Sequence, residues 1–128
     1  MKRLYIAFAL IVLLSAFAGY HVFCLSTLAN QVTEQLAQAQ EQVDQEHWED
    51  AIQITRQAKE QWTAREWYLH TTLHHNGIDA ILISFDETLA FLEGEEHQPA
   101  EYAAANARLI TQIELLKEAE LPSLKNLL

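Results

Sequence analysis

The sequence predicts an all-α protein, in which an N-terminal transmembrane helix leads into a small antiparallel bundle of about four helices. Residues 4–33 contain no Lys, Arg, Asp or Glu. The rest of the chain is rich in Ala, Leu, Gln and Glu, which are strong helix formers, and the whole chain holds only three glycines and two prolines. No useful stretch alternates apolar and polar residues with the period of two that a strand would show.

The apolar segment that begins at Leu4 is long enough to cross a bilayer. A helix of ~20 residues spans the ~30 Å of hydrocarbon, and it satisfies its own backbone hydrogen bonds there. Lys2 and Arg3 precede the segment, so the positive-inside rule places the N-terminus in the cytoplasm and the remainder outside the cell membrane. We therefore expect a single-pass anchor over residues 1–28 and an extracytoplasmic bundle over residues 29–128.

A cleaved signal peptide is the alternative for this segment. It would have an apolar core over residues 4–14 and Ala16-Phe17-Ala18 as its small-x-small cleavage site. Because the chain stays apolar well past Ala18, we favour an uncleaved anchor. Cys24 is the only cysteine, so no disulfide can form within the chain. It either faces lipid as a small apolar residue or pairs with a second chain.

The charge of the chain excludes one class of partner. There are 8 basic and 18 acidic residues, and Lys2 and Arg3 belong to the cytoplasmic end. The bundle is therefore strongly acidic and repels nucleic acid. The partners we expect are the membrane, through the first helix, and another membrane protein or a second copy of this chain.

Four helices are predicted after the anchor, from apolar residues at three- and four-residue steps. The first continues from the anchor, the second begins at Trp48, the third covers about residues 64–92, and the fourth follows the loop "EGEEHQPAE" and stops near Pro122. Gly94 suits the end of the third helix, and Pro99 suits the first turn of the fourth. The expected buried residues are Leu25, Leu28, Val32, Leu36, Ala39 and Val43; Trp48, Ala51, Ile52, Thr55, Ala58 and Trp62; Ile78, Leu82, Phe85, Leu89 and Leu92; and Tyr102, Leu109, Ile113 and Leu116.

The third helix contains a possible interruption at Asn76-Gly77. The dipeptide either ends one helix before a second begins at Asp79, or weakens a continuous helix by ~1 kcal/mol. The apolar phase survives across Gly77, which favours a continuous or kinked helix.

The stretch "HTTLHHNGID", residues 70–79, is the main candidate for a binding site. On a helix, His70 and His74 lie one turn apart, and Glu66 lies one turn before His70. Two imidazoles and a carboxylate are ligands that zinc accepts, so Glu66, His70 and His74 are the predicted metal ligands. No HExxH motif or cysteine pair accompanies them. Packed bundle histidines, or a pH switch in which two charged imidazoles repel each other, explain the same pattern.

The remaining features of the sequence favour a structural role over a binding or catalytic one. Trp48, Trp62 and Trp67 have helical spacing and are expected to fill the core, although a sugar- or lipid-binding platform is an alternative. The acidic loop around Glu95 lacks the pattern of a calcium loop. No Gly-rich phosphate loop, nucleophile elbow or catalytic triad occurs, so we expect no enzyme, no catalytic residues and no cofactor beyond a possible divalent cation. The predicted function is a membrane-anchored interaction module; the alternative is a cation- or pH-sensing module that uses the histidines.

The chain also resembles a family known as a domain of unknown function, DUF4363. The resemblance rests on the basic start and apolar anchor, the Trp48, Trp62 and Trp67 series, the "GIDAI" that follows His74 and His75, and the closing "ELPSLKNLL". It covers nearly the whole chain and implies a small single-anchor helical protein, mostly of Gram-positive bacteria, with no established activity. It also implies a multi-span membrane protein as a partner. An acidic residue is expected where Gly77 stands, and this departure bears on helix continuity there.

Overall fold

The computed structural model describes the backbone of residues 1–65 and 75–127, and the side chains of residues 1–65 and 78–119. Within these residues every regular element is a helix and no strand occurs. The helices are α1 (Lys2–Asp44), α2 (Trp48–Ala64), α4 (His75–Glu93) and α5 (Pro99–Leu127). The predicted all-α fold class is confirmed.

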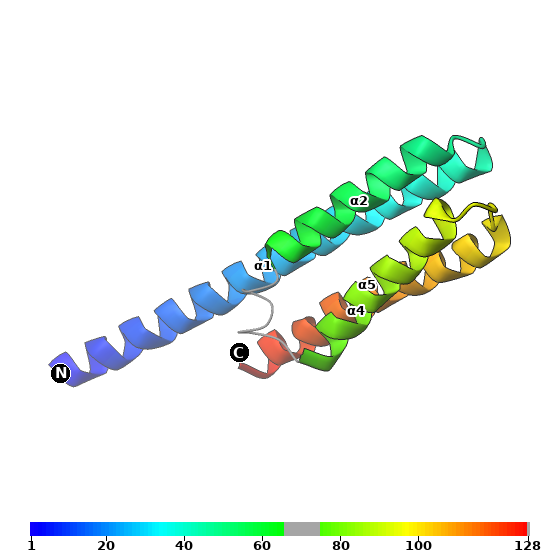
Figure 1. Cartoon of the computed structure of the whole chain (residues 1–128). Helices are drawn as coiled ribbons and strands as arrows, with labels where there is room; N and C mark the ends of the chain where they lie inside the picture. Colours follow the sequence, from blue (N-terminus) through cyan, green and yellow to red (C-terminus); the bar gives the residue numbers. More distant parts are fainter. Residues whose placement is uncertain (66–74, 128) are drawn as a thin grey trace.

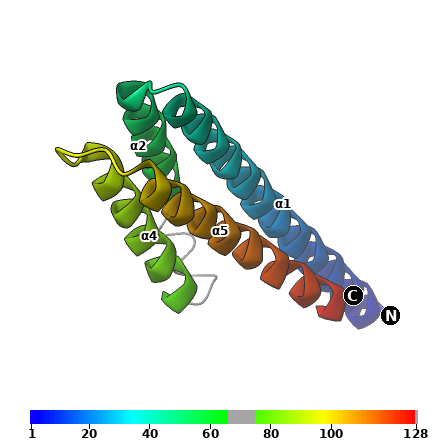
Figure 2. The same ribbon diagram turned by 90° about the vertical axis from the view of Figure 1, so that its right-hand side faces the viewer.

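The four helices form two antiparallel hairpins that lie side by side. α1 packs against α2 and α4 packs against α5, while α1–α5 and α2–α4 contacts join the two hairpins (Figures 1 and 2). The contact between α2 and α4 is the least extensive of these pairs. Both hairpin turns lie at the same end, which we call the distal tip, and the N-terminal half of α1 projects from the other end (Figure 1).

The apolar stripes of the helices meet in two clusters along the bundle. The proximal cluster lies nearer the projecting part of α1, and the distal cluster lies nearer the tip. Most residues of the predicted stripes are buried, and four are only partly buried at the edge of the core: Trp48, Ile52, Leu82 and Leu116. The proximal cluster contains Leu25, Leu28, Ala29, Val32, Leu36, Ala58, Trp62, Ile78, Ile81, Phe85, Leu109 and Ile113, and the distal cluster contains Ala39, Val43, Ala51, Leu92 and Tyr102.

A buried polar residue separates the two clusters on each of three helices. Thr55 on α2, Thr88 on α4 and Asn106 on α5 are each at most 1% exposed. Thr88 Oγ1 donates to the Ser84 carbonyl oxygen of its own helix at 2.8 Å, and Asn106 Nδ2 donates to the Leu36 carbonyl oxygen of α1 at 3.0 Å. Thr55 Oγ1 has no partner among the described residues, so Asn106 is the member of the three that bonds another helix there. A polar group of this kind at a core position fixes the alignment of packed helices at a cost in stability. We call these three residues the polar layer.

The turn between α1 and α2 is closed by its backbone. The His47 amide donates to the Gln42 carbonyl oxygen at 2.7 Å, and the Glu46 amide donates to the Val43 carbonyl oxygen at 2.9 Å. This is the Schellman pattern of a helix C-terminus, which requires a left-handed residue. Glu46 occupies that position with a φ of 64°, where glycine is normally favoured.

The structure corrects the predicted end of the last helix and shows the backbone at Asn76-Gly77. α5 does not stop near Pro122 but continues to Leu127. Because proline has no amide hydrogen, the helix lacks the bond that residue 122 would donate to the Glu118 carbonyl. The backbone of α4 is helical from His75, so Asn76-Gly77 lies inside its first turn. The rest of the predicted third helix, residues 66–74, is outside the described residues.

Candidate functional site

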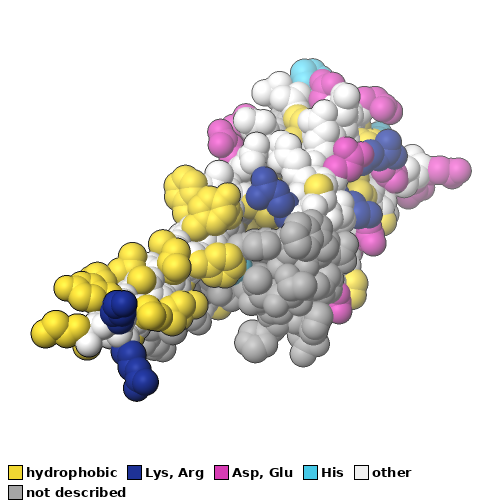
Figure 3. All heavy atoms as spheres, turned by 90° about the vertical axis from the view of Figure 1, so that its left-hand side faces the viewer, with side chains coloured by type: hydrophobic (Ala, Val, Ile, Leu, Met, Phe, Trp, Pro, Cys, Tyr) yellow, Lys and Arg dark blue, Asp and Glu magenta, His cyan; other side chains and the backbone are white. Residues whose placement is uncertain are grey.

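The projecting part of α1 is the most distinctive surface of the molecule. α1 has 43 residues and contains a window of mean hydropathy 2.1, of which only 6% is buried within the protein. Most of its large apolar side chains from Leu4 to Phe23 are at least half exposed. Figure 3 shows these side chains around the helix, with Lys and Arg at its free end and most of the acidic side chains gathered toward the opposite end of the molecule. α1 is therefore long and apolar enough to cross a membrane.

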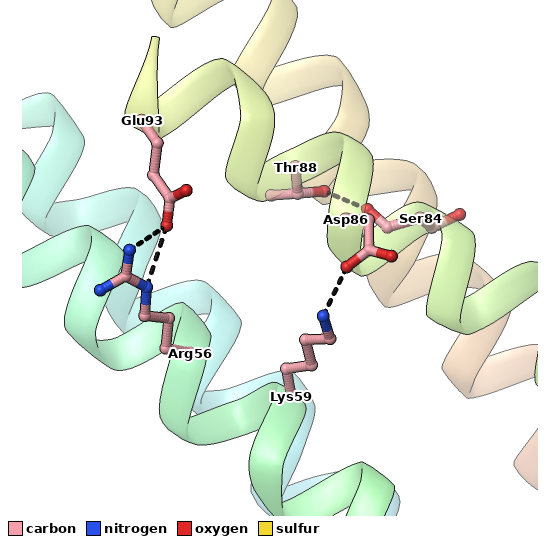
Figure 4. Close-up of polar contacts among 6 residues, drawn as sticks. All are labelled: Arg56, Lys59, Ser84, Asp86, Thr88 and Glu93. Carbon is pink, nitrogen blue, oxygen red and sulfur yellow. Dashed lines mark hydrogen bonds and ion pairs between the residues drawn. The ribbon is translucent and has the colours of Figure 1, made fainter.

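A groove of about 510 Å³ runs along the seam between α2 and α4. Two ion pairs cross it (Figure 4): Arg56 binds Glu93 through Nη2 at 2.5 Å and Nε at 2.9 Å, and Lys59 Nζ lies 2.5 Å from Asp86 Oδ1. Leu89 also lines the groove. The seam therefore combines charged side chains of both signs with the apolar side chain of Leu89.

The distal tip joins the two hairpins through one ring contact. Trp48, the first residue of α2, stacks on His97 of the α4–α5 loop, with ring centroids 4.0 Å apart and an angle of 8° between the planes. Around this stack the described tip carries exposed carboxylates and no Lys or Arg, the carboxylates being those of Asp44, Glu46, Glu49, Asp50, Glu95, Glu96 and Glu101.

One titratable group is buried beneath the tip. Burial raises the pKa of the Tyr102 phenol above its ordinary value, and the negative charge of Asp44 raises this pKa further. The Tyr102 hydroxyl has no hydrogen-bond partner among the described residues. The phenol therefore stays protonated in the folded protein, and its role is to fill the distal cluster.

The predicted metal ligands Glu66, His70 and His74 lie outside the described residues. In the part of the chain that the structure describes, no group of three or more His, Cys, Asp or Glu side chains is placed to hold a metal ion. In the acidic loop, Glu93 is instead paired with Arg56 across the groove.

The predicted tryptophan anchors have different environments. Trp62 is fully buried in the proximal cluster, as predicted. Trp48 is only partly buried and contacts the distal cluster from its edge while its ring stacks on His97. Trp67 is outside the described residues.

Sequence reasoning placed Thr55 in the buried stripe of α2, and the structure confirms this. It did not find Thr88, Asn106 or the Trp48–His97 stack. Asn106 and Thr88 occupy core positions of their helices, but the apolar periodicity passes over polar residues. Asn106 lies four residues after Tyr102 and three before Leu109, so helical spacing puts it on the same buried face. This spacing could have identified it as a core residue. No local pattern pairs Trp48 with His97, because the two belong to different hairpins.

The comparisons with known proteins identify a family and nothing more specific. The model of a family described as Domain of unknown function (DUF4363) matches residues 20–127. The match covers α2, α4 and α5 in full and α1 from residue 20 onward. No curated protein and no solved structure matches the chain.

Proposed function

The chain belongs to the DUF4363 family, and from that premise we propose that it is a membrane-anchored, non-enzymatic interaction module. In this proposal α1 crosses the cell membrane once, with its N-terminus in the cytoplasm. The acidic bundle lies outside the cytoplasm and binds another membrane or cell-surface protein.

The observation that carries the proposal is the double role of α1. Its N-terminal half exposes an apolar surface that a water-soluble protein would bury. Its second half supplies seven buried residues to the bundle, from Leu25 to Val43. The same unbroken helix would therefore hold the bundle at the membrane surface, and Lys2 and Arg3 favour the cytoplasmic side for the free end.

A tethered bundle is suited to a partner in the same membrane. Tethering confines both proteins to a thin layer, which raises their effective concentration without any new contact. The groove between α2 and α4 is the surface we would test first, because Arg56, Lys59, Asp86 and Glu93 line it together with the exposed Ala90.

Site-specific photocrosslinking in intact membranes tests the partner. A photoreactive residue would replace Ala90, an exposed residue that lines the groove, and as a matched control Ala107, an exposed residue of α5 that does not line it. We expect Ala90 to give a discrete adduct with a membrane protein or with a second copy of the chain, and Ala107 to give none. No adduct from either position would count against an interaction module.

The membrane tether is tested separately by the N-terminal sequence and mass of the mature protein. Retention of residues 1–18 in a membrane-bound form supports an anchor. A mature chain that begins after Ala18 would show that the segment is a signal peptide.

A further inference from the structure

The apolar surface of α1 meets the bundle without a linker. Phe23 is 67% exposed, whereas Leu25, two residues later, is 2% exposed and belongs to the proximal cluster. α1 is helical throughout this junction. A bundle attached in this way begins within one helical turn of the end of the apolar surface.

Arg65 lies at this junction. It follows the last residue of α2, and its amide donates to the Trp62 carbonyl oxygen at 3.2 Å. Its side chain is exposed and borders a pocket of about 120 Å³, which is otherwise lined by residues of α1 between Phe23 and Gln31. The apolar surface of α1 and the guanidinium group therefore meet in one place.

The other described basic side chains of the bundle have polar partners. Arg56, Lys59 and Arg108 are paired with carboxylates, and Lys117 Nζ donates to Asn30 Oδ1 at 2.9 Å. Arg65 alone among these five makes no side-chain hydrogen bond or ion pair with a described residue. Its charge is available to a group outside the bundle.

The length of the apolar surface matches the distance between the two headgroup layers. Arg3 and Cys24 are separated by about 31 Å along a helix axis, and the hydrocarbon of a bilayer is ~30 Å thick. With α1 across a bilayer, Arg3 would lie at one boundary, and Arg65, which borders the same pocket as Cys24, would lie at the other. Tyr5 and Tyr20 are exposed near the two ends, where aromatic residues favour the membrane–water interface.

We propose that Arg65 binds the phosphate group of a membrane phospholipid, so that the bundle rests directly on the bilayer surface. This inference depends on the membrane tether of the proposed function. A guanidinium group offers a planar fork of N–H donors that matches phosphate oxygens, and desolvation at the interface strengthens the contact. The acidic tip is at the far end and is repelled by anionic lipids, so a cation at the near end also helps to orient the bundle.

The test is the proximity of arginine side chains to lipid phosphorus in the full-length protein. The chain has four arginines, at positions 3, 56, 65 and 108. The protein would carry carbon-13-labelled arginine and be placed in phospholipid vesicles. In solid-state NMR, a phosphorus-31 nucleus close to a guanidinium carbon dephases the signal of that carbon, so the dephased signal counts the arginines that lie against phosphate. We expect Arg3 and Arg65 to contribute, so that Arg65→Gln halves the dephased signal. The control Arg56→Gln removes a side chain nine residues nearer the tip and should leave the dephased signal unchanged.

A second arm separates lipid phosphate from free phosphate. In bilayers of a phosphate-free glycolipid with inorganic phosphate in the buffer, we expect no dephasing at Arg65; a signal that Arg65→Gln removes would show a free-phosphate site and overturn the lipid assignment. In phospholipid, equal dephased signals from Arg65→Gln and from the unsubstituted chain would overturn the proposal. In that case, flotation of the protein with the vesicles would still support the membrane tether. If the unsubstituted chain does not float with vesicles, the tether itself is wrong and this inference fails with it.

Discussion

The side-chain amide of Asn106 on α5 donates a hydrogen bond to the main-chain carbonyl oxygen of Leu36 on α1 at 3.0 Å, although 70 residues separate the two. The bond joins the two hairpins at the polar layer, between the proximal and distal clusters. Asn106 Oδ1 has no partner among the described residues. A core position that is only half satisfied favours alignment of the hairpins over maximum stability.

Replacement of Asn106 by leucine, which has nearly the same shape, tests this balance. The lost hydrogen bond costs ~1 kcal/mol, whereas apolar burial and removal of the unpartnered oxygen contribute at least as much. We expect Asn106→Leu to match or exceed the unsubstituted protein in thermal unfolding midpoint in detergent micelles. Asn106→Ala, which leaves a cavity, should lower the free energy of unfolding by ~2 kcal/mol. A loss of that size in Asn106→Leu would show that the hydrogen bond itself stabilises the bundle.

Glycine at position 46 should stabilise the α1–α2 turn. Glu46 has a φ of 64°, in the left-handed region that costs a residue with a side chain ~1 kcal/mol relative to glycine. We expect Glu46→Gly to raise the free energy of unfolding by about 0.5–1 kcal/mol, measured by thermal unfolding followed by circular dichroism. As a control, Glu41→Gly within α1 should lower it by a similar amount, because glycine is unfavourable inside a helix. A decrease in both variants would mean that the left-handed cap is not formed.

Tyr102 should make the protein sensitive to alkaline pH. Its pKa is raised in the folded state by burial and by Asp44, relative to the ordinary value of 10.0. Above about pH 10 the unfolded chain releases the phenol proton while the folded chain retains it, so stability is full below that pH and falls as the pH rises. Tyr102→Phe should therefore lose less stability than the unsubstituted protein between about pH 10 and 11.5, measured as the unfolding midpoint. Tyr5→Phe, at an exposed position, is the control and should follow the unsubstituted protein; parallel curves for Tyr102→Phe would contradict the prediction.

The Trp48–His97 stack should hold the two hairpin turns together at the distal tip. A stacked aromatic pair contributes ~0.5–1.5 kcal/mol beyond the area it buries. We expect His97→Ala to speed amide hydrogen exchange in residues 94–98 several-fold while the global unfolding midpoint changes little, since His97 is exposed. Trp48→Phe keeps an aromatic ring and should retain most of the protection. Unchanged exchange in His97→Ala would show that the stack does not restrain the loop.

These features show which parts of the structure the sequence can specify. The stripe from Leu25 to Val43 was predictable, because a helix that packs on one side must repeat apolar residues every three or four positions. The loop between Gly94 and Pro99 was predictable from the chemistry of helix ends. Contacts between hairpins, such as that of Asn106 with Leu36, were not, because they depend on the alignment of segments that lie far apart in the chain.

The candidate site was predictable to a smaller degree. The apolar segment of α1 was evident from its composition, and the structure adds that it stays exposed as far as Phe23 and enters the core at Leu25. The position of Arg65 at this junction follows from the length of the α1–α2 hairpin, which no single motif encodes. The metal assignment to Glu66, His70 and His74 stays a prediction of the sequence.

Pro122 provides the last test, because the helix continues where the sequence predicts its end. α5 includes residues 99–127, so Pro122 occupies a helix interior. There a proline removes one backbone hydrogen bond and crowds the preceding turn, at a cost of ~3 kcal/mol relative to alanine. Pro122→Ala should therefore slow amide exchange in residues 123–127 by at least tenfold, measured by mass spectrometry of the full chain in micelles. Pro99→Ala is the matched control: at the first position of the same helix a proline costs nothing, so exchange near residue 99 should not slow. If exchange in residues 123–127 were the same with proline and alanine, the helix would end before Pro122, as the sequence alone predicts.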